Sequence, residues 1–120
     1  DMKLPIQYAL TYPDRFKTDF PRFNFLDYPQ LTFEKPDRET FLNLNLAYEA
    51  MELGGTAACA INAANEITVQ AFLDQKIGFL QIAEINEKVM RTVEFVLTPS
   101  YEDYVHIDTM ARQKAIELIG

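Results

Sequence analysis

Apolar side chains recur every three or four positions through much of the chain after residue 37, which is the spacing of one helix face. In residues 37–53, Phe41, Leu44 and Tyr48 follow this spacing. Asp37 at the start is a residue type that caps free helical N–H groups, and the two glycines after the range can end a helix. The pattern therefore predicts a helix over residues 37–53.

Two further helices follow from the same spacing. An alanine-rich run predicts a helix over residues 56–75, with Thr56 as its cap and a turn of two glycines before it. Its small side chains would let neighbouring helices approach closely. Residues 81–97 carry a regular apolar stripe of the kind that packs in helical bundles. Gly78 is expected to separate these two helices.

The C-terminal residues contain two candidate helix starts. Ser100 and Asp103 are spaced like a capping box, which predicts a single turn through about residue 105. Asp108 is then expected to cap a separate last helix over residues 109–119.

The chain before residue 37 is different in character. Residues 1–12 predict a short helix, with a proline suited to its first turn. Residues 13–36 hold four of the six prolines, interleaved with aromatic residues, and two pieces within them are rich in strand formers: 23–25 and 31–33. Frequent prolines confine such pieces to sheet edges. The predicted fold class is mainly α: a bundle of about four helices, preceded by a short helix and a proline- and aromatic-rich connector with one or two short edge strands.

Two interpretations of the aromatic connector stay open from the residues alone. Its aromatic side chains either pack on this chain's own helices or form an interface to other parts of a larger protein. The aromatic residues concerned are Phe16, Phe20, Phe23, Phe25, Tyr28 and Phe33.

Composition narrows the class of protein. A chain of 120 residues is long enough for one compact domain, and its net charge of −7 disfavours a nucleic acid or an anionic membrane as partner. No run of about 20 apolar residues and no secretion signal is visible. The single cysteine, Cys59, can form no internal disulfide and lies among apolar helical residues. It therefore favours a reducing, cytoplasmic compartment.

Three polar side chains share one face of the alanine-rich helix: Asn62, Asn65 and Glu66. Polar groups in the least polar part of a chain need partners. They form either a hydrogen-bonded buried network or a binding site, and the residues alone leave both open.

Other candidates for chemistry are few. The one histidine, His106, has no second histidine or cysteine at metal-ligand spacing, so a zinc site is not indicated. A Ser–His–Asp triad would have to combine His106 with Ser100, the only serine. Three acidic pairs fit helix caps or solvated faces better than a catalytic pair: Glu34/Asp37, Glu49/Glu52 and Glu102/Asp103. The residues alone therefore encode no complete active site.

Two motifs resemble a known family. Residues 60–69, with the sequence Ala-Ile-Asn-Ala-Ala-Asn-Glu-Ile-Thr-Val, and residues 71–73 resemble the C-terminal region of deoxyxylulose-phosphate reductoisomerase. The opening residues 1–10 and the Tyr-Pro-Asp-Arg stretch at 12–15 resemble it too. The resemblance covers essentially the whole chain, with further matches at residues 31–33, 36–37 and 44–50 and at Asp103 and Asp108.

The resemblance implies a function for the larger protein. Members of this family use NADPH and a divalent metal, Mg²⁺ or Mn²⁺. They convert 1-deoxy-D-xylulose 5-phosphate to 2-C-methyl-D-erythritol 4-phosphate in the non-mevalonate route to isoprenoids. They have an NADPH domain, a catalytic domain and a C-terminal helical bundle, and are homodimers. The resemblance implies that residues 1–36 are the tail of the catalytic domain and the linker, and that 37–120 are the bundle.

The family's metal and phosphate ligands precede the position of Asp1. The resemblance therefore assigns no catalytic, cofactor-binding or metal-binding residue to this chain, which is expected to be inactive alone and to have the upstream domains as partners. Met2 matches a methionine near the substrate pocket and is expected to line it. The three polar residues of the alanine-rich helix fall in the bundle, which favours a network tying helix ends to the turn at 54–55. The alternative is an independent, non-catalytic helical interaction module that grips a partner with the aromatic connector.

Overall fold

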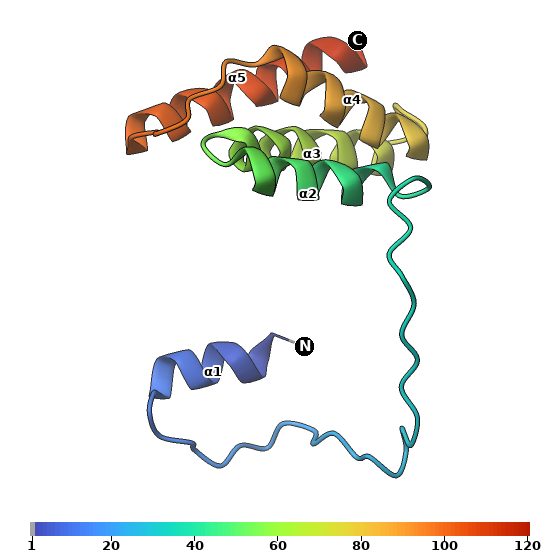
Figure 1. Ribbon diagram of the computed structural model, residues 1–120, viewed down its shortest axis with the longest axis vertical. Helices are drawn as coiled ribbons and strands as arrows, with labels where there is room; N and C mark the ends of the chain where they lie inside the picture. The colour runs from blue at the N-terminus through green and yellow to red at the C-terminus, as the bar shows by residue number, and fades with distance from the viewer. Residues whose placement is uncertain (1) are drawn as a thin grey trace. The chain divides into compact units, whose positions relative to one another are not determined.

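A computed structural model describes residues 2–120, and Asp1 lies outside the described part. The described chain forms five α-helices (Figure 1), so the predicted mainly α class is confirmed. It divides into two compact units, Asp1–Glu34 and Lys35–Gly120. No helix of the described part is long and apolar enough to cross a membrane. The helices are α1 (Lys3–Thr11), α2 (Leu42–Leu53), α3 (Ala57–Leu73), α4 (Phe79–Thr92) and α5 (Tyr101–Ile119).

The first unit consists of α1 and an irregular segment. Helix α1 ends at Thr11, just before the Tyr12–Pro13 peptide bond, because a residue preceding proline is disfavoured in helical conformation. The edge strands predicted at residues 23–25 and 31–33 are wrong: residues 2–120 contain no strand. Residues 25–27 form a turn instead, in which the Asn24 side chain accepts a hydrogen bond from the Leu26 N–H at 3.1 Å. Strand-forming residue types do not make a strand without a neighbouring strand to pair with.

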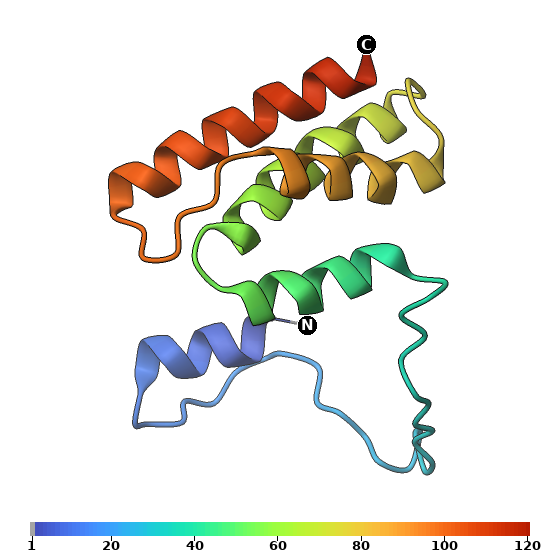
Figure 2. The same cartoon turned by 45° about the horizontal axis from the view of Figure 1, so that its top comes forward.

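The second unit is a four-helix bundle built around α3, which contacts α2, α4 and α5 (Figure 2). The prediction that neighbouring helices approach the alanine-rich helix closely is therefore confirmed. Five of its six alanines are buried, and Ala63 and Ala64 completely so. Small side chains let three helices approach one helix closely. The larger residues of the core come from the other helices and the connecting turn: Ile77, Ile82, Ile85, Val89 and Ile107.

Helix α2 begins at Leu42, five residues later than the sequence predicted. Asp37 does act as a cap, but of a separate turn: its Oδ1 accepts hydrogen bonds from the N–H groups of Glu39 and Thr40, at 3.1 and 2.9 Å. These bonds lower the pKa of Asp37, the one from Thr40 most. Asp37 is therefore a cap, as its residue type predicted. It begins a single turn before α2 and does not begin α2 itself.

Helix α4 runs from Phe79 to Thr92 and ends five residues before the predicted boundary at 97. The backbone becomes extended at Val93 and then meets the turn before α3. There the Thr56 N–H donates to the Val96 carbonyl at 3.1 Å, and the Val96 N–H donates to the Thr56 hydroxyl at 3.0 Å. The sequence predicted that the Thr56 side chain caps α3, and this is wrong, because that side chain makes no cap hydrogen bond. It joins the start of α3 to the loop after α4.

The last helix is continuous. The predicted capping box is confirmed, since the Asp103 N–H donates to Ser100 Oγ at 3.2 Å and the Ser100 N–H donates to Asp103 Oδ2 at 2.8 Å. The box starts the whole of α5, so the predicted break before residue 109 is wrong. Asp108 lies inside the helix and pairs with Arg112 one turn later, at 2.8 Å. A residue that can cap a helix also suits its interior when a cation lies four positions on.

Candidate functional site

The central polar feature of the bundle is Asn86, which is completely buried between the helices. Its Nδ2 donates hydrogen bonds to Asn43 Oδ1 on α2 and to Asn65 Oδ1 on α3, both at 3.1 Å. Its Oδ1 accepts one from the Thr68 hydroxyl at 3.0 Å. We call these four residues the Asn86 network. No buried side-chain nitrogen or oxygen within residues 2–120 lacks a partner. A fully satisfied network of this kind holds helices in register and leaves no buried group free for a ligand.

The structure divides the three polar residues predicted to act together. Asn65 is half-buried and belongs to the Asn86 network. Asn62 and Glu66 are exposed, and the Asn62 Nδ2 donates to Glu66 Oε1 at 3.2 Å. The expectation that all three tie helix ends to the turn at 54–55 is wrong. Asn65 connects the middle of α3 to α4, and the turn is held by Thr56.

Sequence reasoning missed Asn86 itself. A signal was present, because position 86 follows Ile85 on the apolar face that Ile82 and Val89 define. An amide on such a face is the residue to examine first, since burying it without partners costs free energy.

Glu66 joins a second polar group around the half-buried Arg112. The Arg112 Nη2 donates to Glu66 Oε2 at 2.7 Å, and its Nε donates to Asp108 Oδ2 at 2.8 Å. Hydrogen bonds to Asp108 and to Glu66 raise the pKa of Arg112. A similar pair joins α4 to α2, where Arg91 Nη2 donates to Glu49 Oε2 at 2.8 Å. Exposed pairs of this kind contribute about 1 kcal/mol or less each and serve mainly to align helices.

The remaining sequence candidates lie apart or are already engaged. His106 is exposed on α5, while Ser100 and Asp103 are occupied by the helix cap, so the three form no triad. Cys59 is half-buried, with its Sγ 3.6 Å from the Tyr104 carbonyl oxygen, and burial raises the pKa of its thiol. A raised thiol pKa disfavours the reactive thiolate.

A metal site is not formed either. The described residues include no group of three or more histidine, cysteine, aspartate or glutamate side chains placed to hold a metal ion. The four glycines form no phosphate-cradling loop in the sequence. The described residues therefore do not offer the ligands that a divalent metal or a dinucleotide would need.

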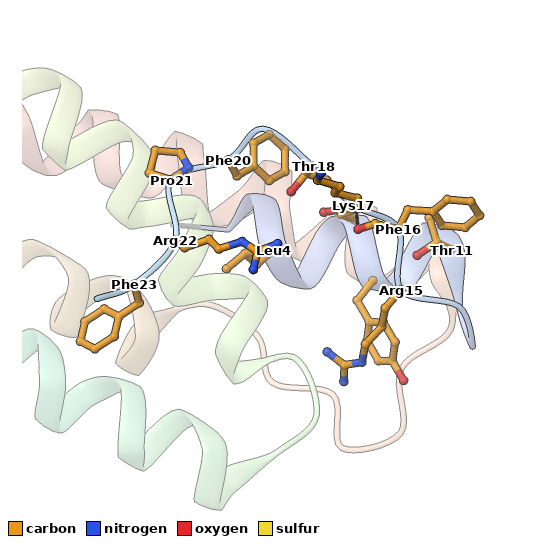
Figure 3. Close-up of a pocket in the computed structure, with 12 residues that line it drawn as sticks. Leu4, Thr11, Arg15, Phe16, Lys17, Thr18, Phe20, Pro21, Arg22 and Phe23 are labelled. Carbon is orange, nitrogen blue, oxygen red and sulfur yellow. Dashed lines mark hydrogen bonds between the residues drawn. The ribbon is translucent and has the colours of Figure 1, made fainter. Parts of the chain in front are cut away.

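The first unit contains a cavity of about 360 Å³ between α1 and the segment that follows it (Figure 3). Gln7 on α1 donates from Nε2 to the Phe16 carbonyl at 3.4 Å, which holds the segment beside the helix. The Arg15 guanidinium lies 4.7 Å from the centre of the Tyr8 ring. Met2, the predicted pocket-lining residue, is 67% exposed at the start of α1 and does not line this cavity.

Substitution of Asn65 tests whether the Asn86 network stabilises the bundle. Replacing Asn65 with leucine removes one acceptor of the Asn86 amide, so we expect the free energy of unfolding to fall by about 1–3 kcal/mol. Denaturant unfolding followed by circular dichroism measures the change. Unchanged stability would show that Asn65 is not held in the network and would reopen its assignment to a binding site.

The described residues define a helical-bundle domain with a satisfied polar interior, preceded in the sequence by a short helix and an irregular aromatic segment. Its family follows from the sequence match. The model of the DXP reductoisomerase C-terminal domain matches residues 1–114, and this chain belongs to that family. The resemblance found in the sequence is thereby confirmed.

Relatives and solved structures agree with this assignment. The chain is 52% identical over 119 residues to 1-deoxy-D-xylulose 5-phosphate reductoisomerase of Bacteroides fragilis, covering 99% of this chain and 31% of the relative. It is 51% identical over 119 residues to that of Ruminiclostridium cellulolyticum, again 31% of the relative's length. The chain thus spans about a third of the relatives that it matches.

Two solved structures share the fold. The reductoisomerase from Zymomonas mobilis in complex with NADPH matches with a TM-score of 0.86 and 44% identity, over 99% of this chain and 32% of that one. A reductoisomerase in complex with NADPH, fosmidomycin and magnesium matches with a TM-score of 0.84 and 35% identity, over 99% and 31%.

Proposed function

We propose that this chain is the C-terminal structural part of an NADPH- and metal-dependent reductoisomerase. The whole enzyme would convert 1-deoxy-D-xylulose 5-phosphate to 2-C-methyl-D-erythritol 4-phosphate. One observation carries the proposal: 99% of the chain matches about a third of enzymes that bear this name, at about half identical residues. The satisfied interior of the bundle supports a scaffold role, because a scaffold needs rigid, paired polar groups and no free ones.

We assign residues 1–36 to the tail of the catalytic domain and the linker, and residues 37–120 to the bundle. Exposed apolar side chains in the first unit support this assignment, since Phe25 is 76% and Phe33 is 88% exposed. Exposure of so many large apolar groups is typical of a surface that another domain covers. Met2, which is also exposed, would line the substrate pocket.

The cofactors and partners follow from the same proposal. NADPH and Mg²⁺ or Mn²⁺ would bind to the upstream domains of the full-length protein, which would be a cytoplasmic homodimer. The free, unpaired Cys59 is consistent with a reducing compartment.

If NADPH binds to the upstream domains, the isolated chain should not bind it. Isothermal titration calorimetry of the purified 120-residue chain should show no saturable heat, while the full-length protein should bind NADPH. Saturable binding by the isolated chain would contradict the assignment of the cofactor site to the upstream domains.

A further inference from the structure

The cavity of the first unit has an unusual charge for this chain. Among its lining residues are three cations, Arg15, Lys17 and Arg22, and no aspartate or glutamate. The whole chain carries 18 acidic against 11 basic residues, so a lining without any acid runs against the composition. The rest of the lining is largely apolar, including Leu4 and Phe20.

These three cations have no ionic partner within residues 2–120. Two arginines of the bundle differ in this respect, because Arg91 and Arg112 each contact two carboxylates. No hydrogen bond of the described chain is donated by the side chain of Arg15, Lys17 or Arg22. Arginines that line a partly apolar cavity and donate no side-chain hydrogen bond within residues 2–120 are suited to bind a carboxylate.

Arg15 is already held in place for such a contact. Its guanidinium lies over the face of Tyr8, 4.7 Å from the ring centre. A cation–π contact of this kind does not use the N–H donors in hydrogen bonds, so they stay available to an acceptor. Arg22 extends from the segment after α1 toward Leu4 (Figure 3).

We propose that this cavity receives an acidic side chain from the part of the full-length reductoisomerase that lies outside this chain. The inference rests on the proposed function. Two observations favour a protein segment over a small free anion. The relatives are about three times as long as this chain, so most of the protein is available to fill the cavity. The apolar lining needs cover by a segment with apolar residues beside its carboxylate, which a free anion does not supply.

The test uses the full-length protein and the 120-residue chain side by side, with the double variant Arg15→Gln/Arg22→Gln. In the full-length protein we expect the melting temperature to fall by several degrees and the loss to shrink as salt is raised. In the 120-residue chain we expect a clearly smaller fall that does not depend on salt in the same way, because only the contact of Arg15 with Tyr8 is lost there. The variant Arg15→Lys/Arg22→Lys, which keeps the charge, should restore part of the loss. Lys88→Gln on α4, which removes an exposed cation from the bundle, is the matched control and should leave both proteins unchanged.

Two results would overturn the inference. One is a full-length double variant as stable as the wild type. The other is inorganic phosphate raising the melting temperature of the wild-type 120-residue chain but not of its double variant, because the cavity would then be a site for small anions. A wild-type full-length protein without reductoisomerase activity would overturn the proposed function instead, and the stability comparison would still decide the role of the cavity.

Discussion

Replacing Gly55 with alanine is expected to destabilise the bundle more than any other single methyl group added to it. The Gly55 backbone has φ +49°, where an L-residue costs about 1–2 kcal/mol. An added Cβ would also lie 2.3 Å from the Val96 carbonyl oxygen and 3.0 Å from the Leu97 Cα, which are backbone atoms. The loop would have to move, and the paired hydrogen bonds between Thr56 and Val96 would weaken. We expect a total loss of about 3–5 kcal/mol in the free energy of unfolding.

Urea unfolding of the Gly55→Ala variant measures this loss in the free energy of unfolding, and the Gly78→Ala variant is its control. Gly78 has no positive φ, and a Cβ there would meet only the flexible Gln81 side chain at 3.4 Å. That control should cost about 1 kcal/mol or less. Equal stability of the two variants would show that the loop after α4 does not pack closely against Gly55 in the turn before α3.

Replacing Asn86 with leucine is expected to cost about 2–4 kcal/mol, because a buried side chain of similar size would leave several polar groups without their partner. Thr68 is completely buried and would keep only the Asn65 carbonyl oxygen, at 3.2 Å, as an acceptor. Asn43 is exposed and can turn to water, which limits the loss.

The matched control for Asn86→Leu is Asn62→Leu, which changes an exposed amide on α3. We expect it to alter the free energy of unfolding by about 0.5 kcal/mol or less. Thermal and denaturant unfolding of both variants provide the comparison. If Asn86→Leu were as stable as the wild type, the network would not specify the packing of α2, α3 and α4.

The helices themselves were predictable because their signal is local. Apolar spacing located all four helices of the bundle, and the capping box at Ser100 was read correctly. The predicted starts of α2 and of the last helix were wrong because residues that suit a helix start also suit other positions. Asp37 and Asp108 both suit a helix start, but Asp37 caps a turn and Asp108 pairs with Arg112 inside α5.

The parts that could not be predicted depend on contacts between distant residues. Val93 and Val96 continue the apolar stripe of α4, yet the chain leaves the helix there because Val96 pairs with Thr56, 40 positions away. Asn86 likewise finds Asn43 across 43 positions. The spacing of residues in the sequence contains no information on which of these pairs meet. The pocket of the first unit is a further case, since its lining brings cations at positions 15–22 beside Leu4 and Tyr8 of α1.

We propose that this chain is the scaffold of a reductoisomerase and that the catalytic groups lie in the upstream domains. The most direct test is NADPH oxidation in the presence of 1-deoxy-D-xylulose 5-phosphate and Mg²⁺. It is measured for the full-length protein and for the 120-residue chain at equal concentration. We predict turnover by the full-length protein and none by the isolated chain. Turnover by the isolated chain, or none by the full-length protein, would contradict the claim.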